Sequence, residues 1–134
     1  MRSQEAMTMP YKILIVEDND NNRTLFRDIL MFQGYEVLVA SDGQEGVTVA
    51  SQHMPDLILM DIQMPGMDGM TAARYLKAAP ETSELKIIAL TSFAMQGDRE
   101  KFIAAGFDGY ISKPVNTREL PLLVKQWLAE KAQP

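Results

Sequence analysis

The sequence predicts an α/β domain built on an open, doubly wound parallel sheet. Short apolar runs alternate along the chain with longer amphipathic segments, which is the order of strands and helices in successive βαβ units. The runs are continuously apolar, as is typical of strands that helices bury on both faces. A chain of 134 residues has room for one such domain and little more.

Five segments are predicted to form the strands. Three of them are strongly apolar, and the second and fifth are weaker because polar residues interrupt them. In chain order the predicted strands are 12–16, 35–40, 57–60, 87–90 and 107–112.

Four helices are predicted between the strands from their end signals. Gly34 and Gly106 follow the first and the fourth amphipathic segments, and glycine is the common residue just past a helix end. Pro55 requires the second helix to stop at or before Met54. The predicted helices are 20–33, closed by Gly34, and 42–54, 70–79 and 95–105.

A fifth helix is predicted after Asn116. Asn116 and Glu119 are spaced as in a capping box. Apolar residues then recur at 120, 123, 124, 127 and 128, the spacing of one buried helix face. Pro121 conflicts with a start at Asn116 because it has no N–H to donate, so we expect a loosened first turn.

Composition excludes several classes of site. The chain has no cysteine and a single histidine, His53. A disulfide framework, a cysteine nucleophile and a cysteine zinc site are therefore excluded, and a Ser/His/Asp triad is hard to build. The formal net charge of −5 argues against direct binding to nucleic acid or to an anionic membrane.

Targeting signals are not recognisable in the sequence. No apolar run approaches the ~18 residues that a membrane span requires, and the start of the chain has no hydrophobic signal segment. We therefore expect a cytoplasmic protein without membrane insertion. Its predicted organisation is a loose tail at 1–9, one domain at 10–130 and a short tail at 131–134.

Polar residues directly follow four of the predicted strands. Glu17 and Asp18 follow the first strand, Asp61 the third, Thr91 the fourth and Lys113 the fifth. Ligands of doubly wound sheets bind at the carboxyl ends of the strands. Each residue alone is ordinary at a strand end or a helix start, but this joint arrangement is improbable by accident.

These residue types together indicate phosphoryl transfer. Clustered carboxylates repel one another unless a cation is present, and a set of hard oxygens without histidine favours Mg²⁺, with Mn²⁺ as an alternative occupant. The cation, the Lys113 ammonium and the Thr91 hydroxyl would surround an anion carried by Asp61. Positioning and charge neutralisation perform most of the catalysis in phosphoryl transfer, so Asp61 is a candidate nucleophile.

The motifs around these residues resemble the receiver domain of two-component response regulators. The matching segments are ILIVEDNDNN at 13–22, PDLILMDIQMPGMDG at 55–69, ALTS at 89–92 and YISKP at 110–114. The resemblance extends over about residues 10 to 130. It implies a flavodoxin-like, five-stranded parallel sheet of order 2-1-3-4-5 with five helices.

The resemblance also implies roles at the acidic cluster. Asp61 would accept a phosphoryl group from the phosphohistidine of a sensor histidine kinase or a histidine phosphotransfer protein. Asp18, Asp61 and the backbone carbonyl of Gln63 would bind Mg²⁺, and Glu17 would orient a water on the metal.

Further roles concern the phosphoryl group and the switch. Lys113 would pair with the phosphoryl oxygens, and its bond to Pro114 would be cis. Thr91 would turn toward the phosphoryl group and let Tyr110 move inward. This would remodel the face formed by the fourth helix, the fifth strand and the fifth helix.

Two positions are expected to modulate the lifetime of the phosphorylated state. Gln63 and Phe93 lie two residues beyond Asp61 and Thr91, where side chains can overhang the phosphoryl group. Phe93 offers no hydrogen bond to an attacking water, so Phe93→Glu or Phe93→Ala is expected to change autodephosphorylation several-fold. An equally open alternative is that Phe93 simply packs outward.

The expected function is that of a single-domain response regulator similar to the chemotaxis and cell-division types. It would bind an unidentified protein partner or relay the phosphoryl group, and it would not be an enzyme beyond assisting its own phosphorylation and autodephosphorylation. An aspartyl-phosphate phosphatase is the first alternative, but Gln63 occupies the position where such enzymes carry a second carboxylate. A pseudo-receiver that is never phosphorylated is the second.

Overall fold

The structure is a computed structural model that describes residues 10–92 and 97–131. Its five strands form one parallel sheet in the order β2-β1-β3-β4-β5. This confirms the predicted fold class and strand order. The strands are β1 (Lys12–Val16), β2 (Glu36–Ala40), β3 (Leu57–Asp61), β4 (Ile87–Thr91) and β5 (Gly109–Ser112).

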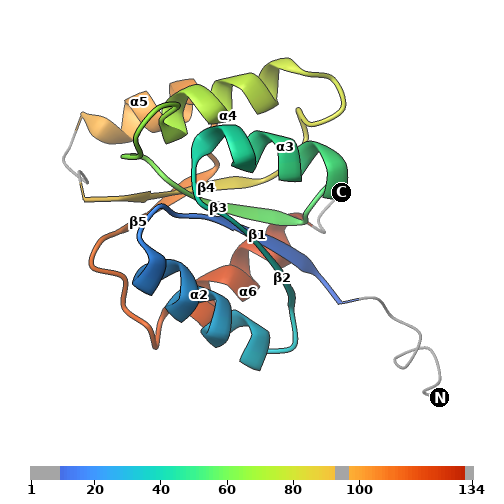
Figure 1. The fold of residues 1–134 in the computed structure, drawn as a ribbon, viewed down its shortest axis with the longest axis vertical. Coiled ribbons are helices and arrows are strands. Elements are labelled where there is room, and N and C mark those ends of the chain that lie inside the picture. The colour runs from blue at the N-terminus through green and yellow to red at the C-terminus, as the bar shows by residue number, and fades with distance from the viewer. Residues whose placement is uncertain (1–9, 93–96, 132–134) are drawn as a thin grey trace.

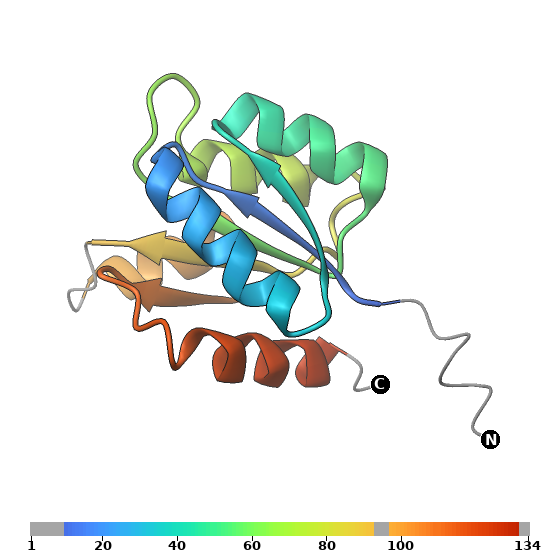
Figure 2. The same ribbon diagram turned by 60° about the horizontal axis from the view of Figure 1, so that its bottom comes forward.

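Helices cover both faces of the sheet (Figure 1). They are α2 (Asp20–Phe32), α3 (Gly43–His53), α4 (Gly69–Ala78), α5 (Asp98–Ala105) and α6 (Leu120–Lys131). Helices α3, α4 and α5 lie on one face, and α2 and α6 lie side by side on the other (Figure 2). The molecule is therefore a three-layer sandwich with its sheet in the middle.

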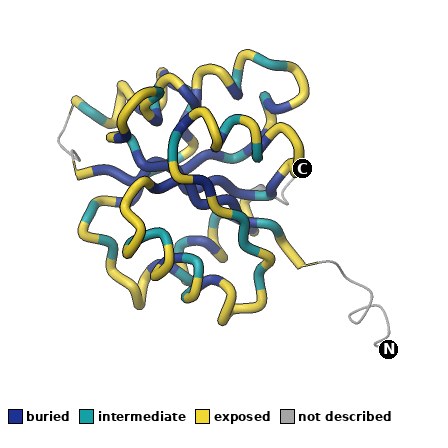
Figure 3. Tube along the Cα trace, viewed as in Figure 1, coloured by how far each residue is buried: buried dark blue, intermediate teal, exposed yellow. Residues whose placement is uncertain are grey.

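The core consists of two clusters separated by the sheet. Successive residues of each central strand contribute to opposite clusters: in β1, Leu14 and Val16 pack with α3, α4 and α5, whereas Ile13 and Ile15 pack with α2 and α6. Figure 3 shows the central strands buried and the outer sides of the helices exposed. Burial on both faces explains why these strands are continuously apolar in the sequence.

Three helices begin at a capping side chain. The side chains of Asn19, Asp42 and Asp68 accept hydrogen bonds from backbone N–H groups in the first turns of α2, α3 and α4. Such caps satisfy N–H groups that have no partner inside the helix. They also fix where the chain turns from the end of each strand into the following helix. These turns lie at the carboxyl edge of the sheet, where the polar cluster is located.

Some predicted boundaries differ from the structure. Strands β3 and β4 each extend one residue further than predicted, so that Asp61 and Thr91 are their last residues. Strand β5 begins at Gly109, because the backbone N–H of Phe107 still bonds to Phe102 and completes the end of α5. Helix α5 begins at Asp98.

Helix α6 begins later than its capping signal suggests. Asn116 accepts hydrogen bonds from the N–H groups of Arg118 and Glu119 in a turn that precedes the helix. The helix starts at Leu120, so Pro121 is its second residue. An N–H at that position has no intrahelical partner, and the proline therefore costs no hydrogen bond.

Parts of the predicted organisation lie outside the described residues, namely the tail at 1–9, residues 132–134, the start of the fourth predicted helix at 95, and Phe93. Helix α6 extends to Lys131, one residue beyond the predicted domain boundary at 130. Within the ranges 10–92 and 97–131, every helix is too short or too polar to cross a membrane.

Candidate functional site

The acidic cluster forms where β1 and β3 end. Val16 is in register with Met60 in these neighbouring strands, so the next residue of each, Glu17 and Asp61, lie side by side. Both carboxyl groups are buried, with residue exposures of 0% for Glu17 and 3% for Asp61. Buried carboxylates need a positive partner or several hydrogen bonds. Here Lys113 provides the positive charge, and backbone N–H groups provide hydrogen bonds.

Lys113, the residue directly after β5, supplies a positive charge. Its ammonium nitrogen lies 3.1 Å from Glu17 Oε1 and 3.1 Å from Asp61 Oδ2. The backbone N–H of Lys113 donates to the carbonyl oxygen of Thr91 at 2.8 Å, which holds this segment to the end of β4. The peptide bond from Lys113 to Pro114 is cis.

Backbone N–H groups bind other oxygens of the two carboxylates. The N–H of Asn19 donates to Glu17 Oε2 at 3.0 Å, and that of Gln63 donates to Asp61 Oδ1 at 3.2 Å. Glu17 Oε1 is buried and, among the described residues, accepts no well-oriented hydrogen bond, so it depends on the ion pair with Lys113. Its distance to the ammonium nitrogen of Lys113 is 3.1 Å.

The pKa of Asp61 is raised from 3.8 to about 7. Burial is the main cause, the negative charge of Glu17 adds to it, and the hydrogen bond and charge of Lys113 partly oppose it. Burial lowers the pKa of Lys113, but its bond to Asp61 and the charges of Glu17 and Asp61 outweigh burial and leave that pKa above its ordinary value. Lys113 alone therefore does not fully compensate the acidic cluster.

The donor set suits a hard divalent cation. Glu17, Asp18 and Asp61 each offer a carboxylate oxygen, and these oxygens lie within 4.8 Å of one another. Asp18 is exposed, so water can complete the coordination. Mg²⁺ prefers one or two carboxylates and retains several waters, and the raised pKa of Asp61 indicates that an added positive charge would be stabilised there. The residues present therefore fit Mg²⁺.

The other residues that the sequence predicts for this site differ in burial and in their contacts. Thr91 is buried at the end of β4, and the exposed Gln63 reaches Asp61 through its backbone. Tyr110 packs with the core on the α5 side, with its ring centroid 6.0 Å from that of Phe102. Phe93 lies outside the described residues. The structure thus brings together Glu17, Asp18, Asp61 and Lys113.

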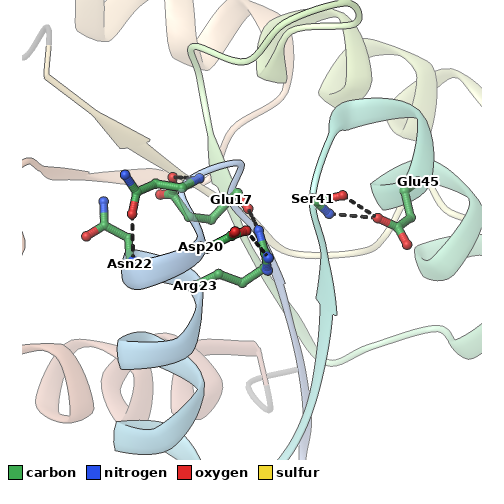
Figure 4. A network of polar contacts seen from close by, with 7 residues as sticks. Glu17, Asp20, Asn22, Arg23, Ser41 and Glu45 are labelled. Atoms are coloured by element: carbon green, nitrogen blue, oxygen red, sulfur yellow. Dashed lines mark hydrogen bonds and ion pairs between the residues drawn. The ribbon is translucent and has the colours of Figure 1, made fainter.

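Two residues that the sequence reasoning did not single out also belong to this site. Arg23 donates from its guanidinium to the backbone carbonyl oxygen of Glu17 at 2.8 Å and pairs with Asp20 (Figure 4). Gly69 packs so closely behind Asp61 that a Cβ at position 69 would overlap the carbonyl oxygen of Asp61. Nothing in the spacing of the motifs points to either contact, because both are made to backbone oxygens.

Comparison with known families gives one match over most of the chain. The model of the response regulator receiver domain matches residues 13–125. Among curated proteins, the polar-differentiation response regulator DivK of Brucella anthropi is 41% identical over 122 residues, which cover 91% of this chain and 99% of that protein. The DivK of Brucella ovis is 40% identical over the same length.

Solved structures give the same result. The receiver domain of a sensor histidine kinase from Pseudomonas aeruginosa, which has a magnesium ion coordinated in its active-site cleft, is 38% identical with a TM-score of 0.82, and the match covers 90% of this chain and 99% of that one. The receiver domain of a Saccharomyces cerevisiae response regulator, co-crystallised with its histidine phosphotransfer protein, is 28% identical with a TM-score of 0.85 and 92% coverage of each chain.

Proposed function

The chain belongs to the response regulator receiver domain family of two-component systems, and on that premise we propose that it accepts a phosphoryl group on Asp61. The observation that carries the proposal is the pairing at the carboxyl edge of the sheet, where a buried aspartate lies 3.1 Å from a lysine ammonium and beside two further carboxylates. Receiver domains are signalling proteins, and we propose that this chain is a phosphoacceptor rather than a turnover enzyme.

The proposed transfer begins at a carboxylate oxygen of Asp61. This oxygen attacks the phosphorus of a phosphohistidine, the phosphorus–nitrogen bond breaks, and its electron pair returns to the imidazole. Negative charge develops on the phosphoryl oxygens, where the Lys113 ammonium, already 3.1 Å from Asp61 Oδ2, stabilises it. The Thr91 hydroxyl, at the end of the adjacent strand, donates to the same group.

The proposed metal site consists of Asp18, Asp61 and the backbone carbonyl of Gln63, with Glu17 holding a water on the metal. When bound, Mg²⁺ supplies charge neutralisation and a template for the incoming phosphoryl group. The carboxylate of Glu17 is held in place for this role, because the N–H of Asn19 donates to one oxygen at 3.0 Å and the Lys113 ammonium nitrogen lies 3.1 Å from the other. Mn²⁺ satisfies the same oxygen ligands.

The proposed output is a change on the face formed by α5, β5 and α6. Tyr110 lies in β5 against Phe102 of α5. Strand β4, which ends at Thr91, lies between β5 and β3, the strand that ends at Asp61. Movement of Thr91 toward the phosphoryl group would vacate space for Tyr110 and change the packing of α5. We propose that Gln63 and Phe93 set how long the phosphoryl group persists.

The proposed partners are a sensor histidine kinase or a histidine phosphotransfer protein upstream, and a protein target or a further phosphotransfer protein downstream. The match to 99% of the length of DivK supports a regulator organised around one receiver domain. The domain boundaries at 10–130 and the cytoplasmic location expected from the sequence are parts of this proposal.

The proposal is tested with phosphoramidate, a small donor whose phosphorus–nitrogen bond resembles that of phosphohistidine. The chain is incubated with this donor and Mg²⁺, and the digested protein is examined by mass spectrometry. We expect one phosphoryl group per chain, on the peptide that contains Asp61. Labelling only on peptides that lack Asp61, or no labelling at all, would contradict this phosphoacceptor role.

A further inference from the structure

Arg23 contacts the loop after β1, which carries Glu17 and Asp18 of the acidic cluster. It lies in α2, one turn after the helix start, and its side chain is 20% exposed. One guanidinium nitrogen donates to the carbonyl oxygen of Glu17 at 2.8 Å, and another pairs with the carboxylate of Asp20. Figure 4 shows this side chain turned back toward the end of β1. Arg23 thus joins Glu17, which follows β1, to Asp20, the first residue of α2.

These bonds restrain the backbone on which the carboxylates stand. The N–H of Glu17 donates to the carbonyl oxygen of Ala40 at 3.0 Å, and the carbonyl oxygen of Glu17 accepts the hydrogen bond from Arg23. Both backbone polar groups of Glu17 are therefore hydrogen-bonded. Asn19 donates to the Glu17 carboxylate and caps α2. Asp18 lies between these fixed residues and is exposed, so its position depends on the backbone that Arg23, Asn19 and Glu17 hold.

We propose that Arg23 is a positioning residue of the metal site, which fixes the 17–20 loop so that Glu17 and Asp18 present their carboxylates to the cation. This inference rests on the proposed function, since it concerns the same site. In the proposed role, Arg23 contacts neither the cation nor the phosphoryl group. It acts through the carbonyl oxygen of Glu17 and the carboxylate of Asp20, as groups behind metal ligands commonly do.

The charge of Arg23 and its positioning role predict opposite effects on metal affinity. A positive side chain near a cation site repels the cation, so removal of its charge alone would tighten Mg²⁺ binding. Removal of a restraint on two ligands would weaken binding, because the free loop must be ordered when the cation binds. The sign of the change therefore distinguishes positioning from a purely electrostatic effect.

The test is titration of the full chain with Mg²⁺, followed by the backbone amide resonances of residues 18, 19, 62 and 63. Arg23→Ala is expected to raise the Mg²⁺ dissociation constant about threefold to tenfold. Arg23→Lys keeps the charge but cannot bridge two acceptors with a fixed fork, so it is expected to bind Mg²⁺ more weakly than the unaltered chain.

Arg27→Ala is the matched control. Arg27 lies one turn further along α2 and pairs only with the exposed Asp28 among the described residues. Its removal changes the net charge by the same amount without touching the loop, so the dissociation constant should stay unchanged or fall. Thermal unfolding of each variant is measured in parallel, and a folded Arg23→Ala protein with weakened Mg²⁺ binding supports the inference.

A second readout separates positioning from catalysis. As Mg²⁺ rises from limiting to saturating, labelling of Arg23→Ala by phosphoramidate is expected to recover a larger share of the unaltered chain's rate, whereas loss of a catalytic group would lower the rate equally at all Mg²⁺ concentrations. An Arg23→Ala protein that binds Mg²⁺ as tightly as the unaltered chain, or more tightly, overturns the inference and leaves the proposed function intact. An unaltered chain that neither binds Mg²⁺ nor becomes labelled overturns both.

Discussion

Asp61 is the proposed phosphoacceptor. Because its carboxyl group is buried beside Glu17, we expect the free energy of unfolding of the chain without Mg²⁺ to depend on pH. The pKa of Asp61 is about 7 in the folded chain and 3.8 as the ordinary value. The folded state therefore binds more protons than the unfolded state between these pH values. It follows that the free energy of unfolding falls as the pH rises through this window.

We expect the unaltered chain in a chelator to lose roughly 1–3 kcal/mol of unfolding free energy between pH 5 and pH 8 relative to Asp61→Asn, which cannot ionise. Urea unfolding at both pH values measures this difference. Saturating Mg²⁺ should remove most of the loss at pH 8. A difference between the two proteins that stays constant with pH would show that Asp61 does not titrate in this range.

Lys113 is expected to affect the rate of phosphorylation more than the fold. Lys113→Ala should lower the rate of labelling by a small phosphodonor about a hundredfold, because it removes the fixed cation at the site where charge develops. Lys125→Ala, an exposed lysine on α6, is the control and should label normally. If Lys113→Ala labels at the normal rate, the ammonium has no part in transfer.

At the scale of elements, the turn from β3 into α4 supports the site from behind. Gly69, the first residue of α4, is buried, and a Cβ there would overlap the carbonyl oxygen of Asp61. Gly69→Ala is expected to destabilise the chain by about 2 kcal/mol or more and to slow labelling, because the end of β3 must shift.

Gly97→Ala is the matched control for that substitution. A Cβ at position 97 would meet open space, so the free energy of unfolding should change by no more than about 0.5 kcal/mol. Urea unfolding of both variants measures the comparison. Equal stability of Gly69→Ala and the unaltered chain would mean that the turn adapts without disturbing Asp61.

Strands could be predicted from the sequence more closely than helix starts. The runs at 12–16 and 87–90 are apolar because both faces are buried, and this signal is local to the strand. The start of α6 was misplaced because Asn116 caps a turn before the helix rather than the helix itself. Local capping signals do not show how many residues such a turn uses.

The residues of the acidic cluster could be predicted from the sequence because they follow the predicted strands directly, whereas the contacts made to backbone oxygens could not. Glu17, Asp61 and Lys113 follow apolar runs, and parallel topology alone brings strand ends to one edge. Arg23 and Gly69 contact backbone oxygens of residues that are near only in the folded chain. No residue type or spacing in the sequence encodes those contacts.

For the whole molecule, the proposal links the phosphoryl site to the face formed by α5, β5 and α6. Incorporated fluorotyrosine reports on this link, since the chain has four tyrosines. On phosphorylation we expect the ¹⁹F resonance of Tyr110 to move and those of Tyr11 and Tyr35, which pair with each other elsewhere, to stay. Thr91→Ala should become labelled without moving Tyr110. A Tyr110 resonance unaffected by phosphorylation would contradict the proposed switch.

We propose that Asp61 takes up one phosphoryl group in a metal-dependent reaction. Intact-mass spectrometry after incubation with acetyl phosphate, in Mg²⁺ or in a chelator, tests it most directly. We expect the gain of one phosphoryl mass in Mg²⁺, little gain in the chelator, and none for Asp61→Asn. A gain that persists in Asp61→Asn, or that is equal with and without the metal, would contradict it.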